Sequence, residues 1–412
     1  MTADDVNPPP VVAPVRASAP RLTAWRFVMA FGTVSLLMDF VYEGARSVTG
    51  PLLAHLGASA LVVGVVTGVG EAAALGLRLV SGPLADRTRR FWAWTVAGYA
   101  LTAVTVPVLG LAGALWAACA LVIAERVGKA VRSPAKDTLL SHATAATGRG
   151  RGFAVHEALD QVGAVLGPLT VAGILALSGN GYGPALGLLA LPGAVALALL
   201  VRLRARVPDP VAYEAAAGPV PVSVAPEQRI RVRLPRAFWV YAGFTGATMV
   251  GFATFGVLSY HLVRHHLLPT AAVPVLYAAA MAVDALAALA TGWLYDRWGA
   301  RVLAALPVLS AVVPVLAFTD AVWPAVLGAL LWGAALGIQE STLRATVADL
   351  VPAGRRATAY GLFASAMGVA TLAGGALTGA LYEVSVPALI TTVAAVQTAA
   401  LVLLLALRVP RA

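Results

Sequence analysis

Charged side chains lie inside long apolar segments of this sequence, where they could bind protons or the charged groups of a ligand. The segment 27–49 carries Asp39, Glu43 and Arg46 at i, i+4 and i+7, which places them on one helical face. A carboxylate that is desolvated but lies near an arginine can exchange a proton near physiological pH. The alternative is a set of permanent ion pairs that only hold helices together. The residues that we assign to a proton-coupling or substrate cavity are Asp39, Glu43, Glu71, Arg126, Asp160 and Asp284.

The cost of burying these charges limits where they can face. Each costs about 2.5–3.5 kcal/mol at the centre of a bilayer on insertion scales, so they must face protein or a watery cavity. Most of them lie in the first half of the chain, whereas the second half offers only Asp284 and Glu340. We therefore expect the first half to carry the coupling chemistry and the second half to be a more apolar wall.

The composition of the 412-residue chain indicates a membrane protein. Hydrophobic residues make up 59% and charged residues 12%, against about 45–50% and about 25% in soluble domains. A helix that crosses a bilayer needs about 20 mainly apolar residues, which predicts an all-α integral membrane protein with twelve transmembrane helices. The twelve segments are 27–49, 59–84, 91–112, 115–135, 152–177, 182–203, 237–262, 272–295, 302–319, 322–345, 357–381 and 386–407.

The connections between these segments differ strongly in charge. With the N-terminus in the cytoplasm, nearly all of the 29 Lys and Arg residues fall on the inner side. This predicts a multi-pass protein of the cell inner (plasma) membrane with both termini cytoplasmic. The expected parts are a disordered tail 1–25, a six-helix bundle 26–203, a Pro-rich linker 204–236 and a second six-helix bundle 237–408.

A short motif occurs once in each half, after the second apolar segment. The first copy, GPLADRTRR, starts at Gly82, and the second copy, GWLYDRWGAR, starts at Gly292. We also expect Trp116 and Trp332 to occupy matching places in the fourth and tenth segments. Two copies at matching positions predict two structurally similar halves.

The motif copies, the twelve segments and the long central linker resemble the major facilitator superfamily. The resemblance implies two pseudo-symmetric six-helix bundles that rock about a central cavity. It also implies that Asp86 pairs with a facing helix end or arginine and locks an inner gate, with Asp296 in the same place in the second half. The first copy departs from the family pattern at Arg89, where glycine is usual. The residues that match the gate motif are Gly82, Asp86, Arg87, Arg90, Gly292, Asp296, Arg297 and Arg301.

The fifth segment contains a glycine motif with two interpretations. Gly163-x-x-x-Gly167-Pro168 resembles the central part of a motif of proton-coupled antiporters in this superfamily. The trailing glycine pair of that motif is absent, since Val171 and Ala172 stand there. Small residues four apart also let helices approach closely, so plain packing is the alternative.

The fourth segment resembles the family's arginine motif, with Arg126 as the arginine. Lys129 and Ala130 replace the usual polar residue and glycine. Glu125 precedes Arg126 and points about 100° away on a helix, so it is a weaker candidate for the site.

Other kinds of site have little support in the sequence. His261 and His265 have helical i, i+4 spacing, but no further ligand accompanies them, so we expect no metal. Phosphate-binding loops and nucleophile motifs are absent, which predicts no cofactor and no enzyme activity. Cys119, the single cysteine, lies in an apolar run. The location of the basic residues accounts for the net charge of +10, so we expect no nucleic-acid partner.

These observations predict a secondary active transporter that moves a small solute by alternating access. The leading hypothesis is proton-coupled export of small amphipathic or drug-like compounds. One alternative is proton-coupled uptake of an organic anion bound by Arg126 and Lys129, and another is a non-transporting scaffold or sensor. The expected partners are a small-molecule substrate, protons and the lipid bilayer, and we expect a monomer.

Overall fold

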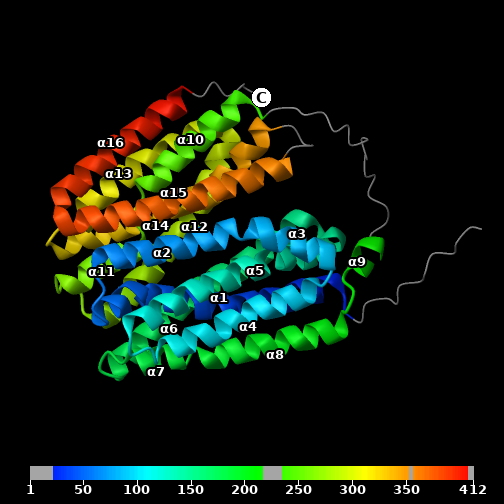
Figure 1. Ribbon diagram of the computed structural model, residues 1–412. Helices are drawn as coiled ribbons and strands as arrows, with labels where there is room; N and C mark the ends of the chain where they lie inside the picture. The colour runs from blue at the N-terminus through cyan, green and yellow to red at the C-terminus, as the bar shows by residue number, and fades with distance from the viewer. Residues whose placement is uncertain (1–21, 217–233, 352–355, 407–412) are drawn as a thin grey trace, which may run out of the picture.

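The computed structural model describes residues 22–216, 234–351 and 356–406, and within these ranges the chain forms helices and no strands (Figure 1). The helices of the first half are α1 (Ala24–His55), α2 (Ala60–Gly76), α3 (Arg78–Thr88), α4 (Phe91–Leu109), α5 (Leu115–Thr147), α6 (Arg149–Leu177), α7 (Tyr182–Gly187) and α8 (Ala190–Arg206). The short α9 (Val211–Ala216) follows. The helices of the second half are α10 (Arg236–Val250), α11 (Phe255–Arg264), α12 (Val273–Trp298), α13 (Ala305–Ala317), α14 (Val322–Leu350), α15 (Arg356–Val384) and α16 (Val386–Leu405).

Each predicted membrane segment coincides with a helix or with two helices separated by a short break. Ten helical stretches of the described chain are long and apolar enough to cross a membrane. One of them, Thr270–Ala317, contains two predicted segments, and α5 is missing from the ten because it carries many charges. The predicted tail up to residue 21, and residues 217–233 of the predicted linker, lie outside the described residues.

One predicted equivalence between the halves is wrong. Trp116 is the second residue of α5 and its counterpart is Trp323, the second residue of α14. Both are exposed, at 77% and 81%, whereas Trp332 is 1% exposed. The prediction matched tryptophans by residue type, but the distance of each residue from its helix start decides which are equivalent.

The two halves form two groups of helices that meet along a central interface (Figure 1). Three helix pairs make most of this interface: α2 with α15, α6 with α12, and α1 with α11. Below, the motif end denotes the end of the bundle where α3 and α12 carry the aspartates Asp86 and Asp296, and the other end is called the opposite end.

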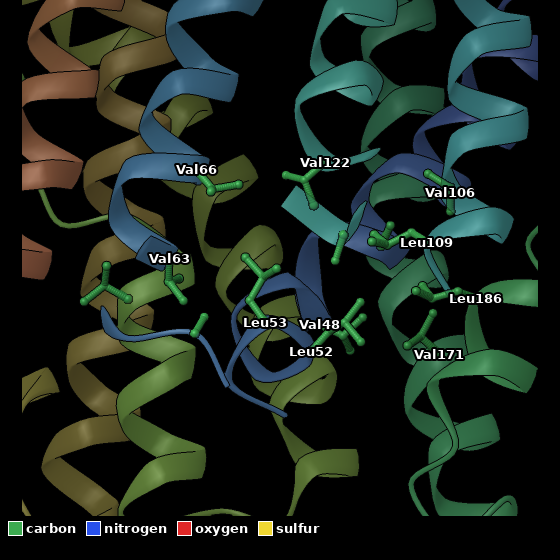
Figure 2. Packing of buried hydrophobic residues seen from close by; sticks show 14 of the residues in the cluster. Val48, Leu52, Leu53, Val63, Val66, Val106, Leu109, Val122, Val171 and Leu186 are labelled. Atoms are coloured by element: carbon green, nitrogen blue, oxygen red, sulfur yellow. The ribbon is translucent and has the colours of Figure 1, made fainter. Parts of the chain in front are cut away.

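Among the described residues, the buried apolar cluster that joins the halves lies at the opposite end. Figure 2 shows the core there, in which Leu52 and Val63 of the first half belong to one cluster with Val257 and Leu389 of the second. At the motif end each half has a separate core, one around Phe27 and Trp92 and the other around Phe238 and Leu303. The protein is therefore closed at the opposite end and divided at the motif end.

Glycines and one carboxylate tighten the closed end between α2 and α15. A Cβ atom on Gly64 would collide with the carbonyl oxygen of Gly375, and the reverse substitution would collide with the carbonyl of Gly64. Glu383 Oε1 accepts a hydrogen bond from the Leu61 backbone N–H at 2.8 Å. This bond joins the end of α15 to the first turn of α2, where a negative charge is favoured by the helix dipole.

Candidate functional site

A cavity of about 800 Å³ lies between the halves. Its walls come from α1, α2, α3 and α5 of the first half and from α10, α11, α14 and α15 of the second. The cavity extends from Arg46 and Trp332 to Asp86 and Tyr360 at the motif end. A space of this volume can hold a drug-sized solute.

An ion-pair network crosses three helices at the deep end of the cavity. Glu71 Oε1 lies 3.2 Å from Arg46 Nη2 and 3.4 Å from Arg126 Nη1. Each arginine has a second carboxylate, since Arg46 Nη1 lies 3.6 Å from Glu43 Oε1 and Arg126 Nε lies 3.4 Å from Glu125 Oε2. The structure thus brings together three of the predicted site residues, Glu43, Glu71 and Arg126. Glu125, the weaker candidate, also belongs to the network, because its long side chain reaches the guanidinium of its neighbour.

The second half contributes polar groups to this network. The Tyr277 hydroxyl on α12 donates a hydrogen bond of 2.5 Å to Glu43 Oε2. Glu340 and Gln339 on α14 also line the cavity. The second wall is nevertheless the more apolar one, as predicted. Among the described residues that line the cavity, Glu340 is the one charged residue of the second half, whereas the first half contributes six: Arg46, Glu71, Arg78, Asp86, Arg126 and Lys129.

Tyr42 places two cations beside the cavity. Arg126 Cζ lies 4.5 Å and Lys129 Nζ 4.3 Å from the centre of its ring, and Lys129 Nζ donates to the Tyr42 hydroxyl at 3.1 Å. Such contacts stabilise a desolvated cation. The position of Tyr42, four residues before Arg46 on the same helical face, was the signal that could have indicated it.

The side chain of Arg126 fits against α2 because the facing residue of α2 is a glycine. A Cβ atom on Gly70 would stand 2.7 Å from Arg126 Cγ, so only glycine leaves room for the arginine at this position. No local sequence pattern indicates this role, because the two residues belong to different helices.

A second polar cluster lies inside the first half and does not line the cavity. Lys136 Nζ is 3.1 Å from His156 Nε2 and 3.6 Å from Asp160 Oδ2. Ser35 Oγ contacts His156 Nε2 at 3.3 Å and the Tyr99 hydroxyl at 3.1 Å. Asp160, a predicted cavity residue, is therefore separate from the network around Glu71.

Asp39 and Asp284 form no ion pair with the described members of the network around Glu71. Asp39 is half-buried on α1, and Lys136, Lys129 and Arg132 are the cations that act on it. Asp284 on α12 is 2% exposed, and its Oδ1 has no hydrogen-bond partner among the described residues. Neither residue lines the cavity, so the six predicted residues form more than one site.

In both gate motifs, the helix ends at a residue with a positive φ angle. Arg89 ends α3 in the left-handed region at φ 49°, and Gly299 ends α12 at φ 62°. Both residues stand three positions after the motif aspartates, Asp86 and Asp296. The positive φ explains why glycine is usual there, and it shows that Arg89 accepts an unfavourable conformation.

The charged residues of both motif copies are exposed at the motif end. Asp86 lines the cavity mouth with Gly82, and no described side chain forms an ion pair with it. Its predicted role in closing the gate stays a prediction, since the gate is open here. The remaining motif residues lie at the same end: Arg87, Arg90, Gly292, Asp296, Arg297 and Arg301.

The glycine motif of α6 packs against α1. A Cβ atom on Gly163 would collide with the carbonyl oxygen of Leu36, and one on Gly167 with that of Phe40. Pro168 lies within α6, whose helix continues past it. These contacts favour the packing interpretation of the motif.

The histidines at the opposite end have partners within the second half. His261 contacts the Tyr382 hydroxyl at 2.8 Å through Nδ1, and His265 Nδ1 lies 2.9 Å from Asp320 Oδ1. The described residues hold no group of three or more side chains suited to a metal ion.

Comparison with known proteins shows the same architecture elsewhere. The family model of the Major Facilitator Superfamily matches residues 30–319 and 271–412. An uncharacterized protein of Mycobacterium tuberculosis is 66% identical over 398 residues, which cover 96% of each chain.

Two solved structures have the same fold. A mutant of the nucleoside transporter NupG has a TM-score of 0.73 at 13% identity, over 93% of this chain and 100% of that one. The peptide transporter POT in complex with sulfate has a TM-score of 0.70 at 16% identity, over 95% and 96% of the two chains. At these identities the likeness concerns the fold alone.

Proposed function

The chain belongs to the major facilitator superfamily, so it is a multi-pass membrane transporter, and we propose that it exports small amphipathic compounds in exchange for protons. The observation that carries this proposal is the network of Glu43, Arg46, Glu71 and Arg126 at the deep end of the cavity. A carboxylate that shares two arginines can release one of them when it takes up a proton. Protonation of Glu71 would thus change the charge of the surface that meets the solute.

The distribution of Lys and Arg supports an orientation for this transporter. It favours the inner membrane with both termini in the cytoplasm, and the motif end then faces the cytoplasm. In the conformation described, the cavity is open at that end and closed at the other. An exporter takes up its solute from the cytoplasm in this state.

The domain division 26–203 and 237–408 supports a rocking motion. In the outward-open state the halves would separate at the core shown in Figure 2 and meet at the motif end. Asp86 would then approach the second half, where the family resemblance places its partner. Weak bonds suit this role, because each must break in every cycle.

Uptake of an organic anion remains the second candidate. Arg126 and Lys129 both line the cavity and would bind a carboxylate. Membership in a family of transporters argues against the third hypothesis, a scaffold that moves nothing. The direction of flux of a labelled anion, in vesicles under an imposed pH gradient, distinguishes uptake from export.

Substitution of the buried acids tests the coupling. A thermal-shift screen against antibiotics, sugars, organic acids and siderophores first finds a ligand, because binding raises the melting temperature by mass action. Its export is then measured in proteoliposomes under a pH gradient. We expect Glu71→Gln and Asp39→Asn to lose gradient-driven export and to keep the melting temperature within a few degrees.

Asp209→Asn is the matched control, because Asp209 is an exposed acid between α8 and α9 outside the cavity. It should export like the unmodified protein. Normal gradient-driven export by both Glu71→Gln and Asp39→Asn would show that the coupling assignment is wrong.

A further inference from the structure

Most charges that line the cavity near Glu71 form ion pairs with one another, but Lys129 and Glu340 have no ion-pair partner among the described side chains. Glu71 compensates Arg46 and Arg126. Lys129, in contrast, has the neutral Tyr42 hydroxyl as its hydrogen-bond partner, and no described carboxylate lies within ion-pair distance of it. Glu340 likewise forms no ion pair with a described side chain, although it lines the same cavity.

These two charges have opposite sign and stand on opposite walls. Lys129 belongs to α5 of the first half and Glu340 to α14 of the second. Lys129 is the cation that acts most strongly on Glu340, and Arg46 also acts on it, against the acids Glu157 and Glu43. Glu340 is exposed and Lys129 is half-buried, and both line the cavity, so a ligand with one cationic and one anionic group can reach and pair with both.

We propose that the substrate is a zwitterion whose anionic group binds Lys129 and whose cationic group binds Glu340. This inference rests on the proposed function and names the substrate class of the same cavity. The same cavity is lined by aromatic side chains of the second half, including Phe252, Phe255 and Trp332. They suit an apolar or aromatic body that carries the two charged groups.

The arrangement discriminates against ligands with one charge. An amine alone leaves Lys129 uncompensated, and a carboxylate alone leaves Glu340 uncompensated. A hydrogen bond to a charged group contributes about 1.5–3 kcal/mol, which corresponds to about 10- to 100-fold in affinity. A molecule with both groups also reaches both halves, so its binding favours the approach of the two walls.

Matched probes test this proposal. We would compare tryptophan, tryptamine and indole-3-propanoate, and then phenylalanine, 2-phenylethylamine and 3-phenylpropanoate, by titrated thermal shift of the full-length protein. Both sets are measured at one pH without a gradient. The zwitterion of at least one set should bind about 10-fold or more tightly than its amine and its acid.

Variants assign each charge to its wall. Glu340→Gln should lower the affinity for the zwitterion about 10-fold or more and leave the affinity for the acid unchanged. Lys129→Gln should also lower the affinity for the zwitterion about 10-fold or more, but leave the affinity for the amine unchanged. Asp209→Asn, which changes an exposed acid between α8 and α9 outside the cavity, should change none of them. The variants' melting temperatures without ligand show whether they are folded.

Several results would overturn the substrate class. These are equal binding of zwitterion and single-charge analogue, no binding of either zwitterion, or a Glu340→Gln variant that keeps the full preference. Because binding is measured without a pH gradient, a zwitterion preference without gradient-driven export would refute the proposed coupling alone. Gradient-driven export of a singly charged solute would refute the zwitterion alone.

Discussion

Replacing Gly167 by alanine tests whether the glycine motif of α6 serves helix packing or transport. The new Cβ atom would collide with the carbonyl oxygen of Phe40 and stand 2.8 Å from its carbonyl carbon and 2.9 Å from its Cα. Ordinary carbon contacts are about 3.5–4.0 Å. Because all three atoms belong to the α1 backbone, no side-chain rotation relieves the overlap, and α6 has to move away from α1.

The loss of folding stability caused by this overlap can be compared with that of a control substitution on the same helix. Overpacking costs about 1–3 kcal/mol, and the better helix propensity of alanine returns about 0.5–1 kcal/mol. We therefore expect Gly167→Ala to destabilise the protein by about 1–2 kcal/mol. Gly173 has no such neighbour within 4 Å, so Gly173→Ala should be neutral or stabilising by up to about 1 kcal/mol.

The assay is the melting temperature of each purified variant, together with its transport rate in vesicles. Packing predicts that Gly167→Ala melts clearly below Gly173→Ala and that transport falls only as far as folded protein is lost. If both variants melt alike while Gly167→Ala alone stops transport, the packing interpretation is refuted and the motif acts in the transport cycle.

Two further substitutions address the ends of the bundle. Arg89→Gly should raise the free energy of unfolding by about 1 kcal/mol, because a left-handed residue with a Cβ atom costs about that much. The control is Arg90→Gly, which should bring no such gain because Arg90 has φ −95°. Equal effects of the two substitutions on the melting temperature would contradict this reasoning. Glu383→Ala removes the bond to the Leu61 N–H, and hydrogen exchange in the first turn of α2 should become faster. Unchanged exchange there would show that the bond does not hold the closed end.

The sequence by itself determined the class of protein and its helices. Apolar runs of about 20 residues can be stable only as helices in lipid, and each predicted segment lies on helix in the structure. The two gate motifs indicated the repeat, and the departure from the family pattern at Arg89 falls on a residue in the left-handed region. These features depend on local composition and spacing, which a sequence contains directly.

The tertiary structure decided which charged residues meet. Helical periodicity shows that Asp39, Glu43 and Arg46 share a side of α1, but it does not say which helix packs there. Only the fold pairs Glu71 with Arg46 and separates Asp160 from both. The reason is physical: an ion pair depends on distances of a few ångströms between side chains of different helices, and helix packing sets those distances.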